Sequence, residues 1–150
     1  QHVSEFNLKD QFQLFMNELQ PILKNGQDIK YHHNGGVHVK MDLSLLRNIM
    51  INLISNAIKF STEGSVIWAE SDMNSSGCLT IKIKDQGLGI PEDDKKHLFE
   101  RFFRGKNVTN IQGTGLGLHI VSKYVELMGG TIEVDSALNE GTTFTLKFTL

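Results

Sequence analysis

Three polar side chains recur on one face of an apolar stretch of the chain, at a spacing that lets them bind one ligand. Asn52, Asn56 and Lys59 stand at i, i+4 and i+7, so in a helix they form one stripe. Burying an unpaired amide costs roughly 1–3 kcal/mol. A polyphosphate with Mg²⁺ would satisfy the row, because Mg²⁺ takes few protein oxygens and a lysine pairs with phosphate. The alternative is that the asparagines bond to neighbouring backbone while Lys59 points into water.

A carboxylate followed by glycines forms a second candidate segment, which reads Asp-Gln-Gly-Leu-Gly-Ile-Pro over residues 85–91. Asp85 would end a strand, and Gly87 and Gly89 would let a ligand approach the backbone closely. The amino group of an adenine ring is a suitable donor to this carboxylate. An ordinary turn between a strand and a helix has the same composition, and because Gly and Asp are the usual turn residues, the segment alone favours that turn.

A glycine-rich segment over residues 113–118, Gly-Thr-Gly-Leu-Gly-Leu, opens a predicted helix. Free N–H groups at a helix N-terminus favour a phosphate. The segment lacks the Lys-Ser/Thr pair of a P-loop. Residues 98–106, which precede it, mix phenylalanines with basic residues. Such a mixture can bind nucleic acid, or it can supply core residues and phosphate contacts.

Helices and strands are interleaved around these segments, with strands in adjacent pairs, so the sequence predicts an α+β fold. We expect a two-layer sandwich in which a mixed sheet of five or six strands packs against about three helices. Asn34–Gly36 predicts a hairpin between the first two strands. Helices are predicted over 12–19, from a cap at Asp42 to about 60, from Pro91 onwards and over 117–128, and strands over 29–33, 37–41, 65–70, 79–84, 131–135 and 142–148.

Composition excludes several classes of function. The 150 residues suit one domain, and a net charge of −2 argues against a nucleic-acid binder held by phosphate contacts. Cys78 is the one cysteine, which rules out an intramolecular disulfide and a thiolate zinc cluster. No apolar run reaches the ~20 residues that cross a bilayer. Because the chain begins at Gln1, we expect it to be a fragment of a larger protein.

Taken in this order and spacing, the segments resemble the ATP-binding catalytic (HATPase) domain of two-component sensor histidine kinases, in the GHKL ATPase superfamily. Residues 52–60 resemble its N box, 85–89 its first glycine box, 99–103 its F box and 113–118 its second glycine box. The resemblance spans nearly the whole chain. It implies a Bergerat-type ATPase fold that binds ATP with Mg²⁺.

The resemblance also implies a role for individual residues. Asn56 matches the Mg²⁺ ligand, and Asn52 matches the asparagine near metal and phosphate, so both are candidate metal ligands. Lys59 and Arg104 match residues that contact phosphates, and with Asn52 they form the predicted catalytic set. Asp85 matches the acceptor of the adenine amino group. The other residues predicted to bind the nucleotide are Phe60, Gly87, Gly89, Gly113, Thr114, Gly115, Leu116, Gly117 and Leu118.

The activity implied is transfer of the γ-phosphate to a histidine on a separate dimerisation and phosphoacceptor domain, and through it to a response regulator. None of the six histidines in the chain is followed by Asp or Glu, so we expect the acceptor elsewhere in the parent protein. The domain is expected in the cytoplasm, without membrane or nucleic-acid contacts, in a parent that is either soluble or anchored in the inner membrane. Two alternatives stay open: a serine kinase that acts as an anti-sigma factor, and a non-enzymatic module in which nucleotide gates docking.

Overall fold

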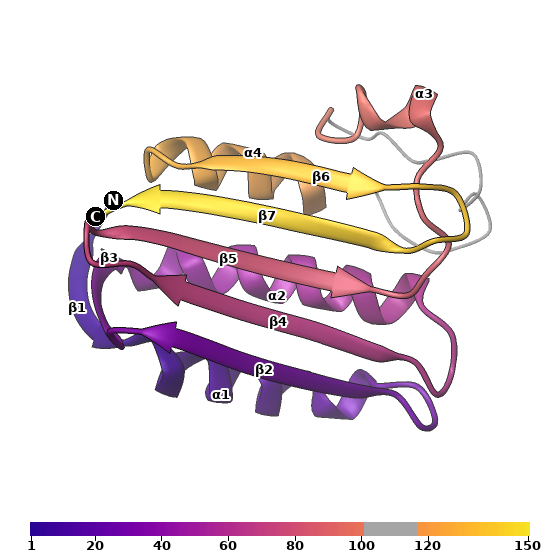
Figure 1. The fold of residues 1–150 in the computed structure, drawn as a ribbon, viewed down its shortest axis with the longest axis horizontal. Coiled ribbons are helices and arrows are strands. Elements are labelled where there is room, and N and C mark those ends of the chain that lie inside the picture. The colour runs from indigo at the N-terminus through magenta and orange to yellow at the C-terminus, as the bar shows by residue number, and fades with distance from the viewer. Residues whose placement is uncertain (101–116) are drawn as a thin grey trace.

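Helices are interleaved with pairs of consecutive strands along the chain, as a computed structural model shows (Figure 1). The structure describes residues 1–100 and 117–150. The strands are β1 (Val3–Asn7), β2 (Asp28–Gly35), β3 (His38–Asp42), β4 (Val66–Met73), β5 (Cys78–Asp85), β6 (Thr131–Ser136) and β7 (Thr142–Thr149). The helices are α1 (Leu8–Leu19), α2 (Leu43–Phe60), α3 (Glu92–Lys95) and α4 (Gly117–Leu127), and a 3-10 turn covers Gln20–Ile22.

Five strands form one mixed sheet in the order β2-β4-β5-β7-β6. β2 runs parallel to β4, and each other neighbouring pair is antiparallel. Along β4 and β5 every second side chain is buried, among them Ile67, Ala69, Ile81 and Ile83. Helices α1, α2 and α4 lie on one face of the sheet (Figure 1). The predicted α+β sandwich with a mixed sheet is therefore confirmed.

The predicted long helix with the polar stripe is α2, and it lies at the centre of the helical layer. Asp42 caps it, because Oδ1 accepts a hydrogen bond from the Leu45 N–H at 3.0 Å. The helix packs against α1, α4 and β5, which leaves little of its surface to solvent. Its buried residues are Leu46, Ile49, Met50, Leu53, Ile54, Ala57 and Ile58.

The predicted hairpin over residues 29–41 is wrong. β2 pairs in parallel with β4 along its whole length, up to Gly35 beside Met73, whereas β3 pairs with β1 in a separate two-stranded sheet. Gly35 has a φ of +88°, and a Cβ there would lie 2.0 Å from the carbonyl oxygen of Met73. The glycine thus serves close pairing with β4, and long-range pairing overrides the local turn signal. The sequence does not predict β1, whose residues are exposed or half-buried.

The helix that follows Pro91 is short, since α3 covers four residues. The sequence predicts Pro91 as the first residue of the helix, but this proline lies one position before it, at the N-cap. Leu98 and Phe99, further along, pack against the core. The turn at Gly129 ends α4 as predicted.

In the described part of the chain, no helix is both long and apolar enough to cross a membrane.

Candidate functional site

Asp85 ends β5 and is nearly closed off from solvent, with 9% of its surface exposed. Its Oδ1 accepts hydrogen bonds from the N–H groups of Gly87 at 2.9 Å and Thr142 at 3.2 Å. Burial raises the pKa of this carboxyl, although the two N–H groups act in the opposite direction. Within residues 1–100 and 117–150, both hydrogen bonds to the carboxylate end on Oδ1. Oδ2 is therefore the oxygen that can accept from a ligand.

The loop after Asp85 is fastened to the turn that joins β6 to β7. The Asn139 N–H donates to the carbonyl oxygen of Leu88 at 2.6 Å. Gly89 has a φ of +73°, and a Cβ there would lie 1.9 Å from the carbonyl oxygen of Ala137. Only glycine fits this position without moving the turn, which gives the second glycine of the segment a structural reason.

Ser136 is the buried junction of this fastening. Its Oγ accepts from the Ile90 N–H at 2.8 Å and donates to the carbonyl oxygen of Gly141 at 2.8 Å. The Thr142 hydroxyl lies 2.9 Å from the Ser136 Oγ, and it is the donor because the Ser136 proton is already used. The Ser136 hydroxyl thus uses its one donor and both of its acceptor positions. Nothing in the sequence singles out Ser136, since serine is common where a strand meets a turn.

The C-terminal end of α2 contacts the same loop. The Leu88 N–H donates to the carbonyl oxygen of Phe60 at 3.4 Å. A Cβ on Gly87 would lie 2.5 Å from that oxygen and 3.0 Å from Oδ1 of Asp85. The first glycine therefore lets the loop backbone lie against the end of α2. The structure brings together Asp85, Gly87 and Phe60, which the sequence assigns to one ligand.

Asn52 and Asn56 are half-buried where α2 faces the start of α4. The Asn52 Nδ2 donates to the carbonyl oxygen of Asn48 at 2.7 Å, a bond within its own helix. A Cβ built on Gly117 would lie 3.2 Å from Oδ1 of Asn52 and 4.0 Å from Nδ2 of Asn56. Both amides thus lie beside the first residue of α4. The alternative, in which the asparagines bond to neighbouring backbone, holds for the nitrogen of Asn52. Its oxygen faces α4.

Lys59 stands in the last turn of α2 with an exposed side chain. Exposure along the polar stripe therefore increases from the half-buried Asn52 and Asn56 to the exposed Lys59. Leu118 is half-buried and packs against the core. Five predicted site residues lie outside the described residues: Arg104, Gly113, Thr114, Gly115 and Leu116.

The aromatic segment before these residues begins in the core. The ring of Phe99 packs edge-on against that of Phe144, with centroids 6.3 Å apart. The Phe99 carbonyl oxygen accepts from Nδ1 of His119 in α4 at 3.2 Å. For this residue the interpretation as a core phenylalanine is confirmed. Residues 101–103 of the predicted F box lie outside the described part of the chain.

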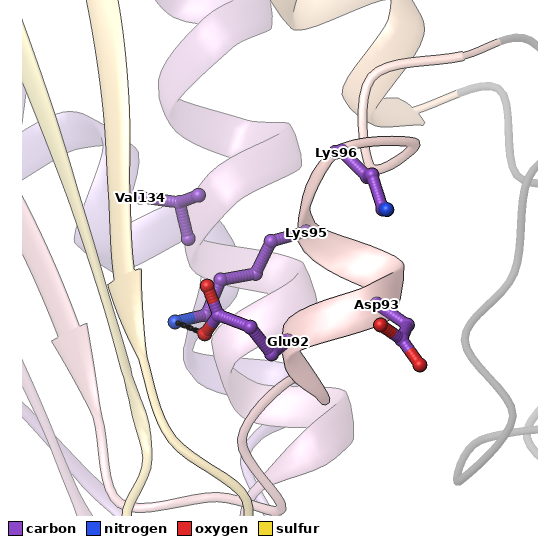
Figure 2. A pocket seen from close by; sticks show the side chains of 5 residues that line it. All are labelled: Glu92, Asp93, Lys95, Lys96 and Val134. Carbon is purple, nitrogen blue, oxygen red and sulfur yellow. Dashed lines mark hydrogen bonds and ion pairs between the residues drawn. The ribbon is translucent and has the colours of Figure 1, made fainter.

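A cavity of about 460 Å³ lies between α3 and β6 (Figure 2). Lys95 Nζ and Glu92 Oε2 pair there at 3.0 Å on the side of Val134, and Asp93 and Lys96 point away from them (Figure 2). The lining contains none of the predicted site residues. We therefore place the candidate site along α2 and the loop after β5, not in this cavity.

Residues 41–150 match the family of histidine kinase-, DNA gyrase B- and HSP90-like ATPases, so the chain belongs to that family. The sensor histidine kinase WalK of Bacillus subtilis (strain 168) is 39% identical over 117 residues, which are 76% of this chain and 19% of WalK. The sensor histidine kinase YvrG of the same organism is 35% identical over 140 residues, which are 89% of this chain and 24% of YvrG. The chain thus spans a quarter or less of these relatives.

Solved structures agree with this assignment. The mycobacterial sensor histidine kinase MprB superposes with a TM-score of 0.84 at 26% identity, over 98% of this chain and 97% of that one. The catalytic domain of histidine kinase ThkA superposes with a TM-score of 0.78 at 27% identity, over 99% and 96%. The predicted resemblance to the catalytic domain of sensor histidine kinases is confirmed.

Proposed function

We propose that the chain binds ATP with Mg²⁺ along α2 and donates the γ-phosphate to a histidine on a separate dimerisation and phosphoacceptor domain. Membership of the ATPase family supports nucleotide binding. The observation that carries the proposal is that the buried acceptor Asp85 and the amide of Asn52 flank one stretch of α2. About 12 Å of helix separates Asn52 from Phe60, at 1.5 Å per residue. A nucleoside triphosphate can bridge that distance.

The base would bind at Asp85. Oδ2 accepts from the exocyclic amino group of adenine, while Oδ1 stays bonded to the N–H groups of Gly87 and Thr142. Guanine has a carbonyl oxygen where adenine has this amino group, so two acceptors would face each other. The site should therefore prefer ATP to GTP.

The phosphates would bind between the amides of α2 and the N-terminus of α4. Asn52 has its nitrogen bonded within the helix and its oxygen toward Gly117, and a neutral amide oxygen is a donor that Mg²⁺ accepts. Asn52 and Asn56 would hold the ion, while Lys59 and Arg104 contact the phosphates. When bound, Mg²⁺ would neutralise charge that develops on the transferred phosphoryl group. The positive end of the dipole of α4, at its N-terminus, would favour the same phosphates.

The acceptor histidine and the response regulator belong to other domains or proteins in this proposal. The chain spans 19% of WalK and 24% of YvrG, so those relatives are long enough to contain further domains. The chain supplies no base in this mechanism, because phosphoryl transfer depends mainly on positioning and on charge stabilisation.

Calorimetric titration with ATP, ADP and GTP, with and without Mg²⁺, tests the binding step. ATP should bind at least about tenfold more tightly than GTP, since a mispaired buried acceptor costs a hydrogen bond to a charged group. Asn56→Ala should abolish the gain in affinity that Mg²⁺ confers. Asn48→Ala is the control, because Asn48 is an asparagine of the same helix and its amide donates to the carbonyl oxygen of Ser44. Equal losses for Asn56→Ala with and without Mg²⁺ would contradict the metal role.

Labelling with ATP that carries a radioactive γ-phosphate tests the transfer step. The chain alone should take up no label, and a phosphoacceptor domain added in trans should take up label that acid removes. Acid-stable label on the acceptor would identify a serine kinase. ATP binding without any transfer would identify a module in which nucleotide gates docking.

A further inference from the structure

The last turn of α2 ends without the left-handed glycine that closes many helices. Its C-cap, Ser61, is extended, with φ −104° and ψ 158°. The final carbonyl oxygens of a helix have no partners inside it, so those of residues 58–60 need donors from elsewhere. Each of the three obtains one from a different residue outside the helix.

Gln27, in the connection between α1 and β2, supplies the buried donor. Its Oε1 accepts from the Lys24 N–H at 2.7 Å, which identifies this atom as the oxygen. Its Nε2 faces the carbonyl oxygens of Ile58 and Thr62, each at 3.2 Å, and that of Ser61 at 3.4 Å. An NH₂ group has two protons to give, so this amide is fully used.

Lys24 closes the same end from the solvent side. Its Nζ donates to the carbonyl oxygens of Lys59 at 2.8 Å and Ser61 at 2.6 Å. A cation is favoured at the negative end of the helix dipole. Lys24 is exposed and water can replace it, whereas Gln27 is 7% exposed and water replaces it less readily.

The helix end held in this way carries Lys59 and Phe60, two of the predicted nucleotide-binding residues. On its other side, the Phe60 carbonyl oxygen takes the Leu88 N–H and lies against Gly87. The turn is thus fixed between the α1–β2 connection and the loop that follows Asp85. A displacement of the turn would move Lys59 and Phe60 relative to that carboxylate.

We propose that Gln27, assisted by Lys24, is a positioning residue of the nucleotide site, which holds the last turn of α2 so that Lys59 reaches the phosphates while the base lies at Asp85. This inference rests on the proposed function. Neither residue lies within the segments that resemble the N, F and glycine boxes of the family, and neither needs to touch the nucleotide.

Calorimetric titration of the Gln27→Met variant with ATP and Mg²⁺ tests the proposal. Methionine keeps the length of the side chain and removes both donors. The Kd should rise about tenfold with unchanged stoichiometry. Gln13→Met, the same substitution on the exposed face of α1, is the control and should leave the Kd unchanged. A fall in stoichiometry at an unaltered Kd would show that Gln27 only stabilises the fold, and the proposal would be wrong.

A double-mutant cycle with Lys59→Met asks whether Gln27 acts through Lys59. Interaction energies show as departures from additivity. The double variant should bind ATP with Mg²⁺ only slightly more weakly than Lys59→Met alone. Full additivity of the two losses would overturn the positioning role.

Lys24→Met serves if Gln27→Met does not fold. The lysine is exposed, so the variant should fold and should bind ATP with Mg²⁺ about two- to threefold more weakly, as for loss of a partly hydrated cap. An unchanged Kd would then contradict the proposal. If the natural chain itself fails to bind ATP, the proposed function fails as well. If the natural chain binds ATP and Lys59→Met weakens that binding, while the Gln27 and Lys24 variants leave the Kd unchanged, only the positioning role fails.

Discussion

The two ends of the proposed nucleotide site are built differently. The base end consists of Asp85, the loop over residues 86–90 and the turn between β6 and β7. Backbone N–H groups that donate to the Asp85 and Ser136 side chains and to the Leu88 carbonyl oxygen hold it together, along with close glycine contacts. The phosphate end consists, among the described residues, of Asn52, Asn56, Lys59 and Gly117. Asn52 and Asn56 lie beside the start of α4, and Lys59 follows in the last turn of α2.

Each end controls different properties of the site. The base end is formed before any ligand arrives, so its geometry contributes both to stability and to the choice of base. The phosphate end gathers an ammonium, amide oxygens and a helix N-terminus, and such groups gain most of their energy when an anion and its metal bind. We expect substitutions at the base end to change stability and base selectivity together, and substitutions at the phosphate end to change Mg²⁺-dependent affinity with little effect on stability.

The largest effect should come from Gly89→Ala at the base end. Alanine at this position would have to keep a φ of +73°, and its Cβ would lie 1.9 Å from the Ala137 carbonyl oxygen. The loop would therefore have to move away from the turn. The free energy of unfolding should fall by at least about 2 kcal/mol, and ATP binding should be lost with it. Denaturant titration measures this. Gly129→Ala is the matched control, with a φ of +71° and no atom within 4 Å of the new Cβ, and it should cost about 1 kcal/mol. Equal costs would show that the fastening contributes nothing.

Asp85→Asn should change both stability and ATP affinity at the base end, in opposite directions. Burial raises the pKa of Asp85 above its ordinary value of 3.8, so the folded state binds this proton more tightly than the unfolded state does. The stability that comes from the proton is present below the unfolded pKa and is lost as pH rises through the folded pKa. At neutral pH the ionised carboxylate thus costs stability, and asparagine removes that cost. We expect a higher Tm and roughly ten- to a hundredfold weaker ATP binding.

The pH dependence of ATP binding provides the control for this substitution. In the natural chain, affinity should fall as acidification protonates Asp85, and because the pKa is raised, this fall begins at a higher pH than for an ordinary aspartate. Asp85→Asn should flatten that part of the profile. A lower Tm for Asp85→Asn would show that the charge stabilises the fold, against the expectation from burial.

How well the sequence predicts each end depends on how far apart in the chain the contacting residues lie. The apolar periodicity of α2 and its cap at Asp42 are local signals, and they predict the helix with its polar stripe correctly. The hairpin prediction fails because Gly35 pairs with Met73 on a strand far along the chain. Residue types at the site are likewise local, whereas their arrangement in space is not.

The residues that fasten the site are the ones that sequence does not reveal. Ser136 meets Ile90 across 46 positions, and Gln27 meets Ile58 across 31. Serine near a turn and glutamine before a strand carry no distinguishing pattern. Their significance appears only when the fold brings them against backbone groups that would otherwise lack a partner.

Ser136→Ala should have an intermediate effect, again at the base end. Removing the hydroxyl takes the partner from the Ile90 N–H and from the Gly141 carbonyl oxygen, so the free energy of unfolding should fall by ~1.5 kcal/mol. The preference for ATP over GTP should narrow as well, because Thr142 next to this junction donates to Asp85. Thermal denaturation and competitive titration measure the two effects. As a control, Thr142→Ser keeps a hydroxyl in place and should change neither the stability nor the preference for ATP by much. If Ser136→Ala lowers stability but leaves the preference for ATP unchanged, Ser136 plays no part in recognising the base.

The smallest effect on stability should come from Gly117→Ala at the phosphate end. Alanine gains helix propensity, while its Cβ would lie 3.2 Å from Oδ1 of Asn52, so the two contributions oppose each other and stability should change by less than about 1 kcal/mol. Displacing that oxygen should still weaken Mg²⁺-dependent ATP binding by about threefold. In an Asn52→Ala background, Gly117→Ala should cause no further loss of this affinity, because the displaced oxygen is gone. A destabilisation as large as that of Gly89→Ala would mean that the phosphate end is as rigidly formed as the base end, and the contrast between them would disappear.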